Sequence, residues 1–293
     1  MVAEQARNRL IAITMDLKTA LEHAVGVLIS RDVASPRLAA EVLLMHALDC
    51  DRVHLIAHPE RVLTPDEMNQ YHSFVHERAN GKPTQYITGH QEFWGLDLLV
   101  SEAVLIPRPE TEHSVEAALE LARANPSIKK LVDVGTGSGC IALALAKELP
   151  HHEIHATDIS EVALAIAREN SERLGFERVQ LRQCDLLAGV KAGSYDLVVS
   201  NPPYVGKDEP EKVQRIVRDW EPEVAVFSGA TGLEIYERLI PQAFEALRAG
   251  GWLVLEIGYS IEEPIRKLLS GWSEVEIKPD LQGIPRVVVA RKG

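Results

Sequence analysis

The sequence lacks the features that mark disulfide-rich, metal-binding and membrane-spanning proteins. Only three cysteines occur in 293 residues, Cys50, Cys140 and Cys184, and no two of them form a Cys-x-x-Cys pair. Scattered cysteines in odd number favour free thiols in a reducing cytosol over a disulfide scaffold or a zinc site. No apolar run approaches the roughly 20 residues that cross a bilayer, and residues 1–15 show no signal-peptide pattern. We therefore expect a cytoplasmic protein that uses no metal and spans no membrane.

Basic residues are also scarce. The chain has 31 Lys and Arg against 43 Asp and Glu, a net charge of −12, and no Lys/Arg-rich run. Because phosphate neutralisation dominates the affinity of proteins for nucleic acid, this balance weighs against a stable nucleic-acid partner. Distant residues could still assemble a local basic patch, so the charge balance disfavours a nucleic-acid substrate without excluding it.

The order of periodic segments predicts three parts in an α/β protein. Residues 16 to about 80 show helical spacing of apolar residues, and Ser35 and Thr64 each precede a proline as helix N-caps do. They predict a small N-terminal helical domain, residues 1–82, that serves substrate recognition or packing. Residues 83–110 are punctuated by proline and glycine and predict a β-hairpin linker. Residues 111–293 alternate helix and strand, which predicts a mostly parallel sheet with helices on both faces.

Seven strands and five helices are predicted in the C-terminal part. The strands are expected at residues 130–134, 153–157, 178–184, 196–200, 251–257, 274–278 and 286–291, and the helices at 111–124, 139–149, 161–174, 232–247 and 261–269. Ligands of open α/β sheets bind at the carboxyl ends of the strands, where the strand order reverses. Polar residues just after the strands are therefore the candidate site.

A glycine-rich loop follows the first of these strands. Gly135, Gly137 and Gly139 let the backbone turn sharply and approach a ligand closely. A dinucleotide fingerprint would need a further glycine at the position of Cys140, so that pattern fails. Asp133 precedes the loop, where its carboxylate could orient the loop or accept from an ammonium group. An acid beside a helix N-terminus favours a zwitterionic or cationic ligand over an anion.

Two further acids follow the next strands. Asp158 ends the second strand and is well placed to accept hydrogen bonds from ribose hydroxyls. Asp185 follows the third strand, and Leu186 beside it could form a wall for adenine. A loop carboxylate or a helix cap is the alternative for each acid taken alone. The order of glycine loop, acid and acid is more specific than any one of them.

The Asn201-Pro202-Pro203-Tyr204 segment follows the fourth strand and is the most informative stretch of the chain. The side-chain oxygen of Asn201 and the carbonyl of Pro202 can accept both N–H bonds of a planar amide or amino nitrogen. This holds the nitrogen in line with an electrophile and favours partial positive charge on it during attack. Prolines stiffen the loop, and Tyr204 offers a face for stacking. The alternative is a Pro-rich turn that an Asn side chain stabilises.

These stretches resemble S-adenosylmethionine-dependent methyltransferases that modify planar nitrogens. More closely, the chain is similar to the protein-(glutamine-N5) methyltransferases of peptide-chain release factors, the PrmC/HemK family. Pro83–Gly89 with Glu92–Gly95 is similar to the linker of that family, and Leu105–Glu112 to the start of its catalytic domain. Asn201–Val205 matches its active-site motif, and the resemblance extends to Gly283–Arg291.

The resemblance implies a fold, a cofactor and site residues. The fold is a Rossmann-like, seven-stranded methyltransferase domain whose last strand is antiparallel, preceded by the helical domain and the hairpin. S-adenosylmethionine is the implied cofactor. Its methionine part would lie along the loop of Gly135, Thr136, Gly137, Ser138 and Gly139, its ribose on Asp158, and its adenine beside Asp185 and Leu186.

The implied substrate is the glutamine of a Gly-Gly-Gln loop in class-1 release factors, whose N5 methylation modulates translation termination. Asn201, Pro202, Pro203 and Tyr204 would bind its amide. Arg108 and Glu110 would shape the mouth of the site or bind the protein substrate, with a plain salt bridge as the alternative. The competing functions are a nucleic-acid amino methyltransferase acting on adenine N6 or guanine N2, and a cofactor-binding interaction protein without catalysis. The sequence gives no oligomeric state, and a monomer is the expectation.

Overall fold

The computed structural model describes residues 15–208 and 213–293, and the chain divides into two compact units, Met1–Thr88 and Gly89–Gly293. Each unit has its own hydrophobic core. The division falls inside the segment predicted as a linker, because residues 84–88 are helical and the hairpin after them packs in the second unit. Among the residues described, no helix is long and apolar enough to cross a membrane.

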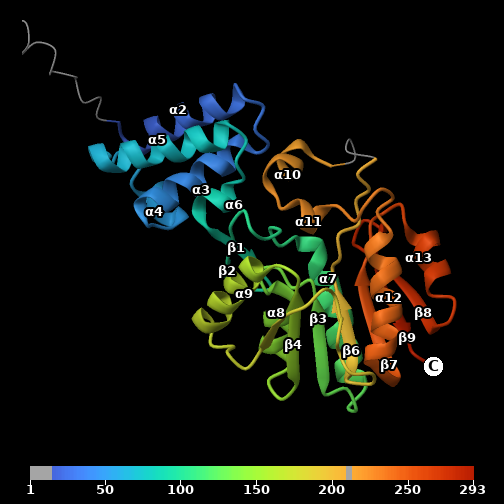
Figure 1. Cartoon of the computed structure of the whole chain (residues 1–293). Helices are drawn as coiled ribbons and strands as arrows, with labels where there is room; N and C mark the ends of the chain where they lie inside the picture. Colours follow the sequence, from blue (N-terminus) through green and yellow to red (C-terminus); the bar gives the residue numbers. More distant parts are fainter. Residues whose placement is uncertain (1–14, 209–212) are drawn as a thin grey trace, which may run out of the picture. The chain divides into compact units, whose positions relative to one another are not determined.

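The N-terminal unit is helical. Its elements are α2 (Leu17–Ile29), α3 (Pro36–Leu48), α4 (Arg52–Ala57), α5 (Pro65–Ala79) and α6 (Thr84–Thr88) (Figure 1). Its core includes Leu28, Leu43 and Tyr71, all fully buried, and the Tyr71 hydroxyl donates to the Ala40 carbonyl at 3.1 Å. Apolar residues at helical spacing therefore form the bundle that the sequence predicts.

The two predicted helix starts differ in their hydrogen bonds. Thr64 makes the expected capping box, in which its side chain accepts from Glu67 N and the Glu67 carboxylate accepts from Thr64 N. Ser35 occupies the N-cap of α3 but makes no side-chain cap bond. Its φ of 49° is left-handed, whereas a capping side chain requires an extended backbone to reach the first N–H groups. Ser35 therefore starts the helix without the stabilisation expected of it.

The hairpin consists of β1 (His90–Phe93) and β2 (Leu96–Leu99), paired antiparallel. Phe93 and Leu98 are buried in the core of the second unit. The backbone N–H of Trp94, at the turn, donates to the Glu112 carboxylate at 2.8 Å. The hairpin is thus packed as part of the second unit.

The second unit is built on a seven-stranded sheet in the order β5-β4-β3-β6-β7-β9-β8. The strands are β3 (Lys130–Val134), β4 (Glu153–Asp158), β5 (Gln180–Gln183), β6 (Tyr195–Ser200), β7 (Leu247–Glu256), β8 (Ser273–Pro279) and β9 (Pro285–Arg291). β9 pairs antiparallel with both of its neighbours, and the other pairs are parallel. This confirms the Rossmann-like methyltransferase fold expected from the sequence. The strand order reverses between β3 and β6, where Val134 pairs with Ser200.

Helices cover both faces of the sheet (Figure 1). They are η1 (Pro109–Thr111), α7 (Glu112–Ala124), α8 (Cys140–Glu148), α9 (Glu161–Arg173), α10 (Arg215–Trp220), α11 (Glu223–Val226), α12 (Glu234–Ala246) and α13 (Glu262–Leu268). Leu131 and Leu197 face a core with α7 and α8, whereas their neighbours Val132 and Val198 face a core with α12 and α13. All six residues of β6 are buried, as expected for a central parallel strand.

Candidate functional site

A cavity lies where the strand order reverses, at the carboxyl ends of β3, β4 and β6. Its volume is about 220 Å³. A smaller hollow of about 40 Å³ shares Gly135, Gly137 and Asn201 with it. The lining of the cavity includes seven residues predicted from the sequence, Gly135, Gly137, Asp158, Asp185, Leu186, Asn201 and Pro203. The sheet therefore brings together residues from four separate loops.

The three glycines of the loop serve two purposes. All have left-handed φ values, 73° at Gly135, 56° at Gly137 and 87° at Gly139. A Cβ on Gly135 or Gly137 would meet no atom within 4 Å, and both residues line the cavity, so their missing side chains leave room there. A Cβ on Gly139 would lie 3.2 Å from Leu143 Cδ1. Gly139 therefore allows close packing, while the first two keep the cavity open.

The backbone N–H groups of this loop are used inside the protein. Gly135 N and Thr136 N both donate to the Thr157 carbonyl, at 2.8 and 2.9 Å. Gly137 N donates to Asp158 Oδ2 at 2.9 Å, and Gly139 N donates to the Thr136 carbonyl at 2.8 Å. A phosphate-binding loop instead aims its N–H groups at the ligand. These four N–H groups are therefore engaged within the protein, which disfavours a phosphate-binding loop and agrees with the failed dinucleotide pattern.

Asp133 lies beneath the loop and does not line the cavity. Its Oδ2 accepts from Thr136 Oγ1 at 2.6 Å and from Ala142 N at 3.2 Å. Burial raises the pKa of Asp133 to about 7, and these two hydrogen bonds oppose the rise. Its Oδ1 has no hydrogen-bond partner among the described residues. The contacts favour the loop-orienting role over direct binding of a ligand, which stays a prediction.

A residue that the sequence did not single out supports the loop from the other side. Asn170 of α9 is fully buried, and its Nδ2 donates to the Ser138 carbonyl at 3.0 Å. The same side chain exchanges hydrogen bonds with the backbone of Leu99 in β2. Asn170 thus ties the hairpin to the glycine loop.

The acids after β4 and β5 already have protein partners. Asp158 accepts from Ser160 N through Oδ1 and from Gly137 N through Oδ2, both at 2.9 Å. Each oxygen retains a further lone pair for a ligand hydroxyl. Asp185 forms an ion pair of 2.5 Å with Arg238 of α12, which also lines the cavity. Arg238 gives no signal in the sequence, because a single arginine on a helix is ordinary.

Asn201 is held by a buried partner. Its Nδ2 donates to Thr111 Oγ1 at 3.0 Å, and Thr111 is 2% exposed. Oδ1 accepts no hydrogen bond from the described residues, so it is an acceptor available at the cavity and the hollow, both of which Asn201 lines. The geometry suits an acceptor for an N–H group.

The other residues of this segment are placed differently. Pro202 and Tyr204 lie outside the lining of the cavity, and the Tyr204 ring packs so closely on Gly258 that a Cβ there would lie 2.9 Å from Tyr204 Cδ2. Burial raises the pKa of the Tyr204 hydroxyl to about 12. The roles predicted for Pro202 and Tyr204 toward a substrate stay predictions.

Arg108 lines the smaller hollow and forms an ion pair with Glu221. The Glu221 side chain is 2% exposed and also accepts from Ile106 N at 3.4 Å. This supports the salt-bridge alternative for Arg108. Glu110 is exposed and lines neither cavity, so its predicted contact with a substrate is untested.

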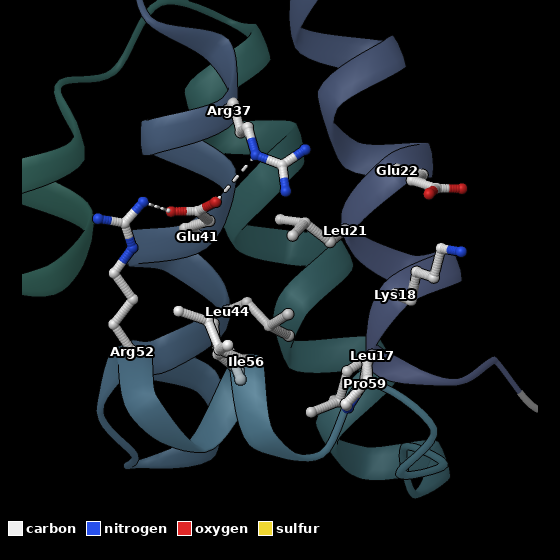
Figure 2. A pocket seen from close by; sticks show the side chains of 11 residues that line it. Leu17, Lys18, Leu21, Glu22, Arg37, Glu41, Leu44, Arg52, Ile56 and Pro59 are labelled. Carbon is white, nitrogen blue, oxygen red and sulfur yellow. Dashed lines mark hydrogen bonds and ion pairs between the residues drawn. The ribbon is translucent and has the colours of Figure 1, made fainter.

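The N-terminal unit has a groove of its own, of about 380 Å³ (Figure 2). Leu21, Leu44 and Ile56 contribute apolar surface between its helices. On one side, the buried Glu41 carboxylate pairs with Arg37 at 3.0 Å and Arg52 at 2.9 Å. The groove therefore combines an apolar floor with two exposed guanidinium groups.

Comparison with solved structures shows the fold. The hMettl16 catalytic domain in complex with the MAT2A 3'UTR hairpin 6 has a TM-score of 0.55 at 18% identity, covering 80% of this chain and 84% of that chain. A methyltransferase from Pyrococcus furiosus has a TM-score of 0.50 at 20% identity, covering 68% of this chain and 90% of that chain. Such low identities carry no statement about substrate.

Comparison with families and curated proteins shows the family. The PrmC N-terminal domain model matches residues 19–89, and the methyltransferase small domain model matches residues 116–221. The release factor glutamine methyltransferase of Koribacter versatilis is 53% identical over 279 residues, 95% of this chain and 99% of the relative. That of Geobacter sulfurreducens is 40% identical, over 94% and 97% respectively. The chain therefore belongs to the release factor glutamine methyltransferase family.

Proposed function

We propose that the protein transfers a methyl group from S-adenosylmethionine to N5 of the glutamine in the Gly-Gly-Gln motif of class-1 peptide-chain release factors, and so modulates translation termination. The observation that carries this is the Asn201 amide, whose Nδ2 is bound by Thr111 while Oδ1 is available beside the cavity. Relatives that match almost the whole chain carry the name release factor glutamine methyltransferase. We place the activity in the cytoplasm, where translation termination takes place.

The lining of the cavity supports a nucleoside ligand without phosphate. Its glycine wall leaves open space at Gly135 and Gly137 and has its N–H groups engaged within the protein, which suits a ligand without phosphate. Asp158 keeps lone pairs for ribose hydroxyls, and Leu186 offers an aliphatic wall for adenine. When bound, S-adenosylmethionine would supply an electrophilic methyl group on a sulfonium sulfur, which would leave as a neutral thioether.

The residues of the chain hold the substrate nitrogen for that transfer. Asn201 Oδ1 and the Pro202 carbonyl would accept its two N–H bonds, so that its lone pair points at the methyl group. These acceptors stabilise the positive charge that develops on the nitrogen during attack. The nitrogen then loses one proton to water, which restores a neutral amide. Catalysis in this scheme is positioning and electrostatic stabilisation, with no covalent intermediate.

We further propose that the N-terminal unit recognises the release factor through the groove in Figure 2. The groove has apolar floor residues and exposed Arg37 and Arg52, and the PrmC N-terminal domain model covers this unit. Ile56, 72% exposed, lines the groove, whereas Val53 on the same helix is 70% exposed and does not line it. Ile56→Asp is expected to raise KM for the release factor about tenfold with kcat unchanged, and Val53→Asp to change neither. Equal KM values for the two variants would contradict the assignment.

The test of the proposed function is transfer of a labelled methyl group from S-adenosylmethionine. Purified release factor, duplex DNA and ribosomal RNA are offered separately. Label is expected on the release factor and is expected to vanish when its Gly-Gly-Gln glutamine is changed to alanine. Label on nucleic acid alone would contradict the assignment of the release factor as substrate. Cofactor binding without any methyl transfer would contradict the assignment of an enzymatic activity.

A further inference from the structure

The loop after β5 is held in a conformation that leucine rarely adopts. Leu186 has a φ of 55°, in the left-handed region. A bulky side chain in that region is strained, and such strain persists only where the surrounding contacts enforce it. Among the described residues that line the cavity, Leu186 is the only non-glycine residue with a positive φ. The strain therefore coincides with the wall predicted for adenine.

Two side chains from other elements hold the peptide bond between Leu186 and Leu187. The Thr157 hydroxyl, from β4, donates to the Leu186 carbonyl at 3.0 Å. The Gln242 side chain, from α12, accepts from Leu187 N through Oε1 at 2.9 Å. Because the carbonyl and the N–H of a trans peptide bond point in opposite directions, this peptide bond cannot rotate without breaking both hydrogen bonds.

The turn around this peptide bond has two further contacts. Ala188 N donates to the Asp185 carbonyl at 3.0 Å, which closes the turn. Arg238, four residues before Gln242 on α12, forms the ion pair with Asp185 described above. Residues four apart lie on the same face of a helix. One face of α12 therefore holds the turn at two points, while the Leu186 side chain itself lines the cavity.

Neither Thr157 nor Gln242 lines the cavity. Thr157 is 2% exposed, and its backbone carbonyl accepts from Gly135 N and Thr136 N of the glycine loop. One residue of β4 therefore serves two walls of the cavity, the glycine loop through its backbone and Leu186 through its hydroxyl. A change of the Thr157 side chain separates the two walls, because every residue keeps the backbone carbonyl.

We propose that Thr157 and Gln242 are positioning residues for the cofactor, which hold Leu186 as the wall against adenine. The inference rests on the proposed function, because it takes adenine as the group beside Leu186. If either hydrogen bond is lost, the peptide bond can rotate and the turn can relax from its strained conformation. The relaxed turn would move the Leu186 side chain away from adenine, which lowers the fraction of the protein that is competent to bind the base.

The experiment compares two ligands that share the amino-acid and ribose parts and differ in the base. S-adenosylhomocysteine carries adenine, and S-ribosylhomocysteine lacks it. Calorimetry gives the Kd of each ligand for the wild-type chain and four variants. Thr157→Val removes the hydroxyl at nearly constant shape, and Thr157→Ser keeps it. Gln242→Leu removes the acceptor, and Gln242→Glu keeps one.

These measurements need no release factor, so they are separate from the test of the proposed function. If the wild-type chain binds S-adenosylhomocysteine but transfers no methyl group to the release factor, the proposed function fails. The ratios of the Kd values of the variants to those of wild type still decide the positioning role in that case.

Thr157→Val and Gln242→Leu are each expected to raise the Kd of S-adenosylhomocysteine about three- to tenfold, the scale of one net hydrogen bond. The Kd of S-ribosylhomocysteine is expected to stay within about twofold, because the backbone contacts of the glycine loop are kept. Thr157→Ser and Gln242→Glu are expected to resemble wild type for both ligands.

Equal losses for the two ligands would show a general loosening of the site and would overturn the positioning role. A wild-type Kd of S-adenosylhomocysteine in Thr157→Val or Gln242→Leu would overturn it for that residue, as would a loss in the matched conservative variant as large as that in Thr157→Val or Gln242→Leu. Should Thr157→Val not fold, Gln242→Leu with Gln242→Glu decides alone.

Discussion

The glycine loop after β3 engages four of its N–H groups within the protein, those of Gly135, Thr136, Gly137 and Gly139, whereas Asn201 after β6 keeps Oδ1 available at the cavity. The two segments lie at adjacent strand ends of one sheet. Saturated polar groups give a rigid surface that selects a ligand by shape. An unsatisfied acceptor held by a buried partner can instead act on a reacting group. The difference supports the proposal that the first segment binds the cofactor and the second positions the substrate nitrogen.

Asn201→Ala has the largest expected effect and tests the role of the second segment directly. Loss of the acceptor is expected to lower kcat by about 10²- to 10³-fold, as for removal of a single group that stabilises transition-state charge. Binding of S-adenosylhomocysteine is expected to change by less than threefold, because the glycine loop is untouched. Single-turnover methylation and calorimetry measure the two effects. A wild-type rate in this variant would remove Asn201 from the mechanism.

Gly137→Ala tests the role of the glycine loop, the other of the two segments. A Cβ there would enter the open cavity, so the Kd of S-adenosylhomocysteine is expected to rise about tenfold or more. Gly175→Ala is a matched control, because Gly175 also has positive φ and open surroundings but does not line the cavity. Both variants are expected to lose about 1–2 kcal/mol of stability from left-handed strain. Equal affinities in the two would contradict the assignment of the glycine wall.

Each segment also covers a buried carboxyl group, Asp133 under the glycine loop and Glu256 under Asn201. Burial raises the pKa of both to about 7 in the folded protein. A folded pKa above the unfolded value means stability that is present at low pH and is lost as pH rises from about 4.5 to about 7. For Glu256 the loss is at most about 3 kcal/mol. The groups that interact with it through charges or hydrogen bonds are Thr111, Arg286, Glu110, Arg108, Tyr204, Tyr236 and Cys140.

Thermal midpoints of wild type and Glu256→Gln at pH 5 and pH 8 measure this effect. The thermal midpoint of the variant is expected to rise relative to that of wild type as pH rises, because glutamine stays neutral. Asp133→Asn is the parallel variant under the glycine loop, and its thermal midpoint is expected to rise relative to wild type in the same way. A constant difference between wild type and Glu256→Gln would show that Glu256 does not hold its proton in the folded state.

The smallest expected effect comes from a variant that tests whether the first segment and its neighbours select a ligand by shape. Leu186 lines the cavity with an aliphatic side chain, and Leu186→Phe would add a ring face for adenine. Stacking contributes about 0.5–1.5 kcal/mol, so the Kd of S-adenosylhomocysteine is expected to fall about two- to tenfold. The Kd of adenosine is expected to fall by the same factor. An unchanged Kd would place adenine away from Leu186.

The sequence predicts the sheet, and it predicts which residues gather at the carboxyl edge of that sheet, for one reason. Buried runs such as Tyr195–Ser200 mark the strands, and parallel strands bring the residues that follow them to one edge. The short helices α6, α10 and α11 escape prediction because four to six residues do not establish a helical period. The hairpin was expected between two domains, but alternation along a strand does not say which core receives Phe93.

The supporting residues of the site could not be predicted in the same way. Asn170, Arg238 and Glu256 are single residues of ordinary type on helices or strands, with no local pattern to mark them. Thr111 lies in the Leu105–Glu112 stretch, but nothing in that stretch marks its side chain as a partner of Asn201. Glu256 reaches the Asn201 segment only because β7 lies beside β6 in the sheet. Asn170 reaches the glycine loop only because α9 packs near β2 and β4. Such contacts depend on tertiary packing, which spacing along the chain does not encode.

Asn170 also links local unfolding of two distant segments. Its side chain bonds both the backbone of Leu99 and the Ser138 carbonyl, so a fluctuation that releases β2 also frees one anchor of the glycine loop. Any ligand that stabilises the loop must then slow hydrogen–deuterium exchange at the Leu99 amide, although Leu99 lines neither cavity. The exchange rate of the Leu99 amide can therefore be used to follow ligand binding at the glycine loop.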